Sequence, residues 1–194
     1  QEPHGYGFRL NPIVNDSDII STYCAVKLAG NFSAHSLLNN VNLSSFINST
    51  WREGGYAYTN TTILPTPEST YYGIKAFLEL NMTYSLIERG LIISYFTLLR
   101  YANLDGGYAR QVGEPSDIQS TFYAVSSLYE IGFTPLQRFE TLNYVLNCNN
   151  SDGGFGLRPG DKHESTFKSG WAAMNTIALF EKYSQLDDEF KERI

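Results

Sequence analysis

Cysteine, basic residues and long apolar runs are all scarce in this chain. Its 194 residues contain only Cys24 and Cys148, so it has no disulfide framework of the kind that small secreted domains need, and either one bridge or two buried thiols fits the count. Fourteen basic against 20 acidic residues give a net charge of −6, which disfavours nucleic acid and anionic membranes as partners. The longest uncharged, mostly apolar run, Gly90 to Leu99, is far shorter than the roughly 20 residues that cross a bilayer. We therefore expect no nucleic-acid partner and no membrane insertion by this segment.

Asn-x-Ser/Thr triplets, in contrast, are abundant. They begin at Asn15, Asn31, Asn42, Asn48, Asn60, Asn81 and Asn149, and each is an acceptor pattern for N-linked glycans on an exported protein. The alternative is that these triplets only reflect loops rich in Asn and Thr. Because the chain starts at Gln1 without a methionine or a signal pattern, its start is compatible with a processed form and decides nothing about export. We expect an extracellular or cell-surface location.

The chain repeats itself four times. A Gly-aromatic pair occurs at Gly7, Gly55, Gly107 and Gly154, and a Ser-Thr-aromatic triplet follows each pair at Ser21, Ser69, Ser120 and Ser165. The triplets are 48, 51 and 45 residues apart. Such a period is typical of repeat architectures, in which each unit is one supersecondary element. We expect one all-α domain over residues 1–194, with repeats of about 1–50, 51–102, 103–149 and 150–194.

Each triplet is predicted to open a helix. In Ser120 to Ile131, for example, apolar residues recur at helical spacing. Acidic or capping residues stand just before each predicted start: Ser17 and Asp18, Glu68, Ser116 and Asp117, and Glu164. The residue four positions after each repeat Ser is small, at Ala25, Gly73, Ala124 and Ser169, which suits a crowded inner layer. A second helix is predicted after Ser33, after Thr83 and after Thr134-Pro135, with a fourth beginning near Asp187. No β-alternation is visible.

Glycine pairs separate the units. Asp105-Gly106-Gly107 and Asp152-Gly153-Gly154 are predicted to supply the positive φ angles that a chain reversal needs. Arg9, Arg110 and Arg158 recur shortly after the Gly-aromatic pair. They are predicted either to form ion pairs between repeats or to line a polar rim around a cavity.

The segment Leu146 to Gly160 resembles a repeat of the protein prenyltransferase β-subunit and squalene/terpene cyclase superfamily. The resemblance lies mainly in Asp152-Gly153-Gly154-Phe155-Gly156-Leu157-Arg158-Pro159. A second segment, Asp105-Gly106-Gly107-Tyr108-Ala109-Arg110 with Ser120-Thr121-Phe122, also resembles such a repeat. The resemblance covers nearly the whole chain and implies a partial α/α toroid of tandem helical hairpins. It does not imply one activity, because such repeats also occur in non-catalytic and cell-surface proteins, and related toroids serve polysaccharide lyases and thioester proteins.

The catalytic residues of that superfamily can be compared position by position. The resemblance implies that the zinc-binding Asp and Cys of prenyltransferases fall here on Glu164 and Thr166, and no His follows His163; Thr is no substitute for a zinc thiolate. The Asp-rich acid of protonating cyclases finds only Asp187-Asp188-Glu189, which is typical of an acidic helix start. The thioester motif is absent from both cysteines. We therefore expect no metal, no cofactor and no catalytic zinc.

Two functions remain open. The favoured one is a non-catalytic, exported or cell-surface module for ligand binding or assembly, whose open repeat ends are covered by another domain or subunit, and which could also hold a glycan or a peptide. Its candidate ligand-binding residues are Arg110, Arg158 and Asp161. The alternative is an enzyme with a cavity site, acting as an isoprenoid transferase or cyclase, or as a polysaccharide lyase or hydrolase. Its acid/base candidates would be Glu164, Asp117 and His163.

Overall fold

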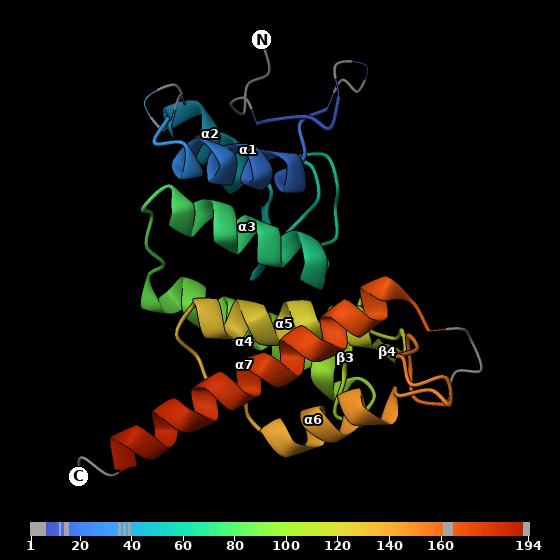
Figure 1. Cartoon of the computed structure of the whole chain (residues 1–194). Helices are drawn as coiled ribbons and strands as arrows, with labels where there is room; N and C mark the ends of the chain where they lie inside the picture. The colour runs from blue at the N-terminus through green and yellow to red at the C-terminus, as the bar shows by residue number, and fades with distance from the viewer. Residues whose placement is uncertain are drawn as a thin grey trace. The chain divides into compact units, whose positions relative to one another are not determined.

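A computed structural model describes residues 7–11, 13, 16–34, 36, 38, 40–160 and 165–191 of the chain (Figure 1). In these residues it contains seven helices and four two-residue strands. The helices are α1 (Ile19–Asn31), α2 (Asn40–Ser49), α3 (Pro67–Glu79), α4 (Leu86–Tyr101), α5 (Ile118–Glu130), α6 (Arg138–Asn147) and α7 (Phe167–Lys191). We call α1, α3, α5 and α7 the first helices, and α2, α4 and α6 the second helices. Within the described residues, no helix is both long enough and apolar enough to cross a membrane.

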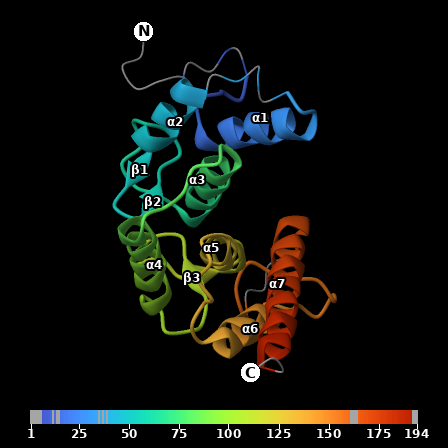
Figure 2. The ribbon, with the colours of Figure 1, turned by 90° about the vertical axis from the view of Figure 1, so that its left-hand side faces the viewer.

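The chain divides into two compact units. The first comprises Gln1–Tyr95 with Glu130–Phe133, and the second comprises Phe96–Tyr129 with Thr134–Ile194. In the first unit α1 packs along α3, and in the second α6 packs against α7 (Figures 1 and 2). The Lys27 ammonium lies 3.1 Å from the Glu79 carboxylate and so links the ends of α1 and α3.

Every first helix begins at a side-chain cap. Two caps, Asp18 and Asp117, are among the predicted residues, whereas Thr66 takes the place predicted for Glu68 and Thr166 caps α7. The predicted Glu164 lies outside the described residues. The residue before the helix accepts a hydrogen bond from the backbone N–H three residues later, which satisfies one of the unpaired donors of the first turn. The four cap-to-donor pairs are Asp18 with Ser21, Thr66 with Ser69, Asp117 with Ser120, and Thr166 with Ser169. The predicted starts were two residues late in the first three repeats, because the triplets lie inside the first turn.

The threonine of the repeated triplet fastens the preceding turn to the helix. Its hydroxyl accepts a hydrogen bond from the backbone N–H of the aromatic residue in the Gly-aromatic pair. The three pairs are Thr22 with Phe8 at 2.8 Å, and Thr70 with Tyr56 and Thr121 with Tyr108 at 3.0 Å. All three threonines are fully buried. The two repeated motifs are therefore the two halves of one structural contact.

The fourth repeat was placed in the wrong register. Ser165-Thr166-Phe167 looks like the triplet, but Thr166 is the cap of α7, so the equivalent triplet is Ser169-Gly170-Trp171. The four caps are then 48, 51 and 49 residues apart, a more even period than the triplets give. The predicted small residue of this repeat becomes Ala173, which is fully buried, instead of Ser169. Gly170 cannot make the contact that threonine makes in the other three repeats.

The second helices are shorter than predicted at their starts. They begin at Asn40, Leu86 and Arg138, several residues after Ser33, Thr83 and Thr134. The fourth prediction is wrong, because no second helix begins near Asp187. Instead α7 continues to Lys191, since no Gly or Pro follows Gly170 to interrupt it.

The glycine turns have the predicted backbone, but they also form strands that the sequence did not reveal. Gly54, Gly106 and Gly153 have φ angles of +110°, +93° and +84°, a region that favours glycine. Antiparallel pairs join β1 (Trp51–Arg52) to β2 (Gly55–Tyr56) and β3 (Tyr108–Ala109) to β4 (Ser116–Asp117). Two-residue strands are too short to show alternation, which is why no β-alternation is visible in the sequence.

Candidate functional site

An aromatic residue occupies the same position in every first helix. It is the fifth residue after the cap: Tyr23, Tyr71, Phe122 and Trp171. The sequence triplets revealed the first three, but the register error replaced Trp171 by Phe167. We call these four residues the aromatic series. Because all four follow the same capped turn, they stand at the same height on their helices.

In the first unit the aromatic series forms a tyrosine cluster. The Tyr72 ring lies 5.5 Å from that of Tyr23 and 5.1 Å from that of Tyr71, measured between centroids. Tyr23, Tyr71 and Tyr72 are each half-buried. Burial raises the pKa of Tyr71, and the neighbouring Tyr23 and Glu130 raise it further. The Tyr71 hydroxyl therefore stays neutral at physiological pH, and the cluster presents a partly accessible aromatic surface.

In the second unit the aromatic series continues into an apolar stripe on α7. Trp171 stacks edge-on against Phe122 at 4.5 Å between centroids, while Phe167, Trp171 and Met174 are 90%, 39% and 59% exposed. Their spacing of four and three residues places them on one helix face. Exposed large apolar side chains gathered in this way mark a binding surface more often than scattered ones do.

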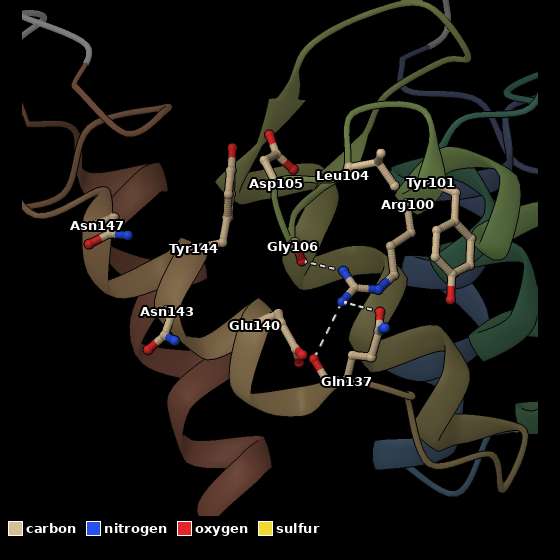
Figure 3. Close-up of a pocket in the computed structure, with 10 residues that line it drawn as sticks. All are labelled: Arg100, Tyr101, Leu104, Asp105, Gly106, Gln137, Glu140, Asn143, Tyr144 and Asn147. Carbon is tan, nitrogen blue, oxygen red and sulfur yellow. Dashed lines mark hydrogen bonds between the residues drawn. The ribbon is translucent and has the colours of Figure 1, made fainter.

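A pocket of about 330 Å³ lies elsewhere in the second unit, between the end of α4 and one face of α6 (Figure 3). At its base the buried Arg100 guanidinium donates through Nη1 to the Gly106 carbonyl at 2.7 Å and through Nη2 to the Gln137 side-chain oxygen at 3.0 Å. Gln137 has a φ of +55°, which is strained for a residue with a side chain. Sequence reasoning missed this pocket because Arg100 and Gln137 lie 37 residues apart and belong to no repeated motif.

Comparisons with known proteins agree with this architecture. The model of the prenyltransferase alpha-alpha toroid domain family matches residues 35–192. This chain belongs to that family.

Two known proteins are similar to this chain. A solved structure of Candida albicans protein geranylgeranyltransferase-I complexed with GGPP superposes with a TM-score of 0.71 at 20% identity, covering 86% of this chain and 50% of that one. A curated drimenyl diphosphate synthase from Streptantibioticus cattleyicolor is 39% identical over 57 residues, which is 29% of this chain and 11% of the synthase. This chain thus spans about half the length of the first protein and a small part of the second. The predicted fold class, a partial α/α toroid of helical hairpins, is confirmed.

The structure places only some of the predicted site residues. Asp161, His163 and Glu164 lie outside the described residues. Asp117 is buried, and its two carboxylate oxygens accept from the Ser120 backbone N–H and hydroxyl, both at 2.7 Å. Arg110 is exposed, whereas the half-buried Arg158 donates to the Ser116 carbonyl at 3.3 Å. Neither arginine forms an ion pair with a residue that the structure describes.

The zinc of prenyltransferases does not fit the described part of the site. The Thr166 hydroxyl accepts from the Ser169 backbone N–H at 3.0 Å and bonds the Ser169 hydroxyl at 2.9 Å, so it is occupied as a cap. Within the described residues, no group of three or more His, Cys, Asp or Glu side chains is placed to hold a metal ion.

The turn acids act as the sequence predicts. Asp105 accepts from the Gly107 N–H and the Ser116 hydroxyl, and Asp152 accepts from the Gly154 N–H and the Ser165 hydroxyl. Two hydrogen bonds lower the pKa of Asp152: the one from the Ser165 hydroxyl has the larger effect, and the one from the Gly154 N–H adds to it. Both acids are therefore parts of the turns.

The two cysteines are not bridged. Cys24 is exposed and Cys148 is buried, so of the two alternatives that fit the count, the bridge is wrong and only one thiol of the pair is buried.

Proposed function

We propose that this chain forms part of the isoprenoid-binding wall of a transferase-like or cyclase-like protein. The observation that carries the proposal is the exposed apolar stripe of the second unit, Phe167, Trp171 and Met174, which contains the last member of the aromatic series. A prenyl chain is apolar, so it gains about 25 cal/mol for each Å² that it buries against such side chains. Aromatic faces also attract a cation that develops when an allylic diphosphate ionises.

The relatives support the same substrate class. One relative is named as a geranylgeranyltransferase in complex with GGPP, and the other as a synthase of drimenyl diphosphate. Family membership alone leaves the activity open, whereas the exposed stripe on α7 adds a surface suited to the hydrocarbon. No comparison supports a polysaccharide substrate, so we do not favour a lyase or hydrolase.

Because Thr166 is occupied as a helix cap, we place the contribution of this chain in substrate binding and not in zinc-assisted thiol activation. Asp117 is committed to capping by both oxygens. Among the predicted acid/base residues, Glu164 and His163 are therefore the ones to test for proton transfer.

A matched pair of phenylalanines tests the binding proposal. Phe167, on the α7 stripe, is 90% exposed, and Phe139, on α6, is 81% exposed. We expect GGPP to quench the fluorescence of Trp171 in a Trp51→Phe background, and Phe167→Ala to weaken binding roughly ten-fold, as loss of a buried phenyl contact implies. Phe139→Ala should leave binding unchanged. Absence of saturable GGPP binding, or equal weakening by both variants, would overturn the proposal.

A non-catalytic role in binding or assembly is the second candidate, favoured by the occupied cap at Thr166. It predicts GGPP binding without turnover, and no difference in product formation between the unmodified chain and Glu164→Gln. Turnover that Glu164→Gln abolishes would exclude it.

We further propose that the chain is exported and glycosylated. Asn15 lies outside the described residues, but none of the other six sequon asparagines is buried: Asn31, Asn48, Asn81 and Asn149 are exposed, and Asn42 and Asn60 are half-buried. The test is the mass of the protein from its native source before and after treatment with an N-glycosidase. A mass that the enzyme lowers in glycan-sized steps supports export, and an unchanged mass contradicts it.

A further inference from the structure

We propose that the pocket between α4 and α6 is the centre of a docking groove for a basic, apolar segment of a partner protein. We define the groove as the pocket together with exposed apolar residues of the segments that border it. These walls are Leu98, Tyr101 and Leu104, from α4 and the turn after it, and Leu136, Phe139 and Leu146, from α6 and the loop before it. All its residues belong to the second unit.

The walls are unusually apolar for a surface. Leu104 and Phe139 are each 81% exposed, and the other four side chains are between 48% and 65% exposed. On α6, Phe139 and Leu146 lie one turn before and one turn after Asn143, which lines the pocket. On α4, Leu98 lies one turn before Tyr101, which also lines it. Exposed apolar side chains concentrated in this way on the segments that border one pocket are typical of an interaction site.

The base of the groove is rigid. The Gly106 carbonyl accepts hydrogen bonds from both Arg100 and the Thr141 hydroxyl, at 2.7 and 2.8 Å. The Arg100 guanidinium also lies over the Tyr108 ring, 5.7 Å from its centroid, so three contacts hold the turn that follows α4. A preformed groove loses little conformational entropy when a partner binds.

The exposed charge at the pocket is negative and favours a basic partner. Glu140 and Asp105 line the pocket and are exposed, while the one cation there, Arg100, is 6% exposed and bonded to the chain itself. Within the described residues Glu140 takes part in no ion pair. The accessible charge is therefore negative, and it complements a lysine or arginine. A second copy of this chain, with a net charge of −6, would meet like charge, so a different, basic chain fits better.

The test uses two short amphipathic helical peptides, one of leucine and lysine and the other with glutamate in place of lysine. Fluorescence anisotropy should show saturable binding of the lysine peptide only. Phe139→Ser should weaken it at least about ten-fold, as expected for a central apolar anchor, and Glu140→Gln several-fold, with a reduced salt dependence. The controls are Val112→Ser and Glu114→Gln, which change an exposed apolar residue and an exposed acid outside the groove.

The outcomes separate this inference from the isoprenoid proposal. Phe139→Ser should leave GGPP binding intact, and Phe167→Ala should leave peptide binding intact. Equal binding of both peptides, or equal weakening by the control variants, would overturn the groove. Sedimentation that shows a dimer dissolved by Phe139→Ser would replace the basic partner by a second copy of the chain.

Discussion

Replacing Gly73 by alanine tests the close approach of α3 to the Tyr56 ring in the first unit. Gly73 lies inside α3, and a Cβ placed there would be 2.3 Å from Cγ and 2.5 Å from Cδ2 of Tyr56. The Tyr56 ring cannot move aside easily. It is 1% exposed, its hydroxyl bonds the Tyr84 hydroxyl at 2.9 Å, and it packs edge-to-face with the Trp51 ring at 5.0 Å between centroids. Alanine gains about 1 kcal/mol of helix propensity over glycine, but overpacking a rigid core costs about 1–3 kcal/mol or more. Because the overlap exceeds 1 Å, we expect a net loss of about 2 kcal/mol.

Gly90→Ala is the matched control. Gly90 lies inside α4 of the same unit, and nothing lies within 4 Å of a Cβ added there, so this variant should gain about 0.5–1 kcal/mol. Urea denaturation followed by circular dichroism measures both variants. In a Tyr56→Leu background, the cost of Gly73→Ala should fall by at least about 1 kcal/mol, because the two sites are in contact. If Gly73→Ala stabilised the chain as much as Gly90→Ala, the close packing of α3 on the turn would be wrong.

Three further predictions concern single interactions. Thr121→Val should lower the free energy of unfolding, measured by urea denaturation, by about 2–3 kcal/mol, because it leaves the buried Tyr108 N–H without its acceptor. Faster hydrogen exchange of the Tyr108 amide would identify this cause. As a control, Thr134→Val at an exposed position should change the free energy of unfolding by no more than about 0.5 kcal/mol. Burial raises the pKa of Tyr108 from 10.0 to about 12. The stability that this shift contributes is complete below about pH 10 and is lost as the pH rises through about 12, so the loss between these values should be smaller for Tyr108→Phe. Lys27→Met should cost at most about 1 kcal/mol, because its pair with Glu79 is partly exposed, and an undiminished cost in high salt would contradict a screened ion pair.

The repeat could be read from the sequence because one contact recurs. The Gly-aromatic pair and the Ser-Thr pair are two partners of a single turn-to-helix contact, so they are spaced by the length of the loop between them. Thr22, Thr70 and Thr121 all satisfy it. The fourth repeat could not be aligned in the same way, because Gly170 replaces the threonine and Ser165-Thr166 supplies a chance copy four residues earlier.

The groove could not be predicted from the sequence for a different physical reason. Its base depends on Arg100, whose partners at Gly106 and Gln137 come from a turn and from the residue before α6. No periodicity places a lone arginine beside a residue 37 positions away. Leu136 and Phe139 also look like ordinary core positions of an amphipathic helix, and only the fold shows them to be 65% and 81% exposed.

The cap of α7 connects the fold of the fourth repeat to its chemistry. The resemblance to prenyltransferases places a zinc-binding cysteine at the position of Thr166, and that position is the helix cap in every repeat of this chain. A zinc thiolate and a cap make opposite demands on one side chain, because a thiolate sulfur must face the metal whereas a cap oxygen must accept from the backbone of its own first turn. Thr166 meets the second demand, as Asp18, Thr66 and Asp117 do in the other repeats. Among the described residues of the fourth repeat, the isoprenoid proposal therefore assigns substrate contact to the apolar side chains that begin one residue later, with Phe167 and Trp171.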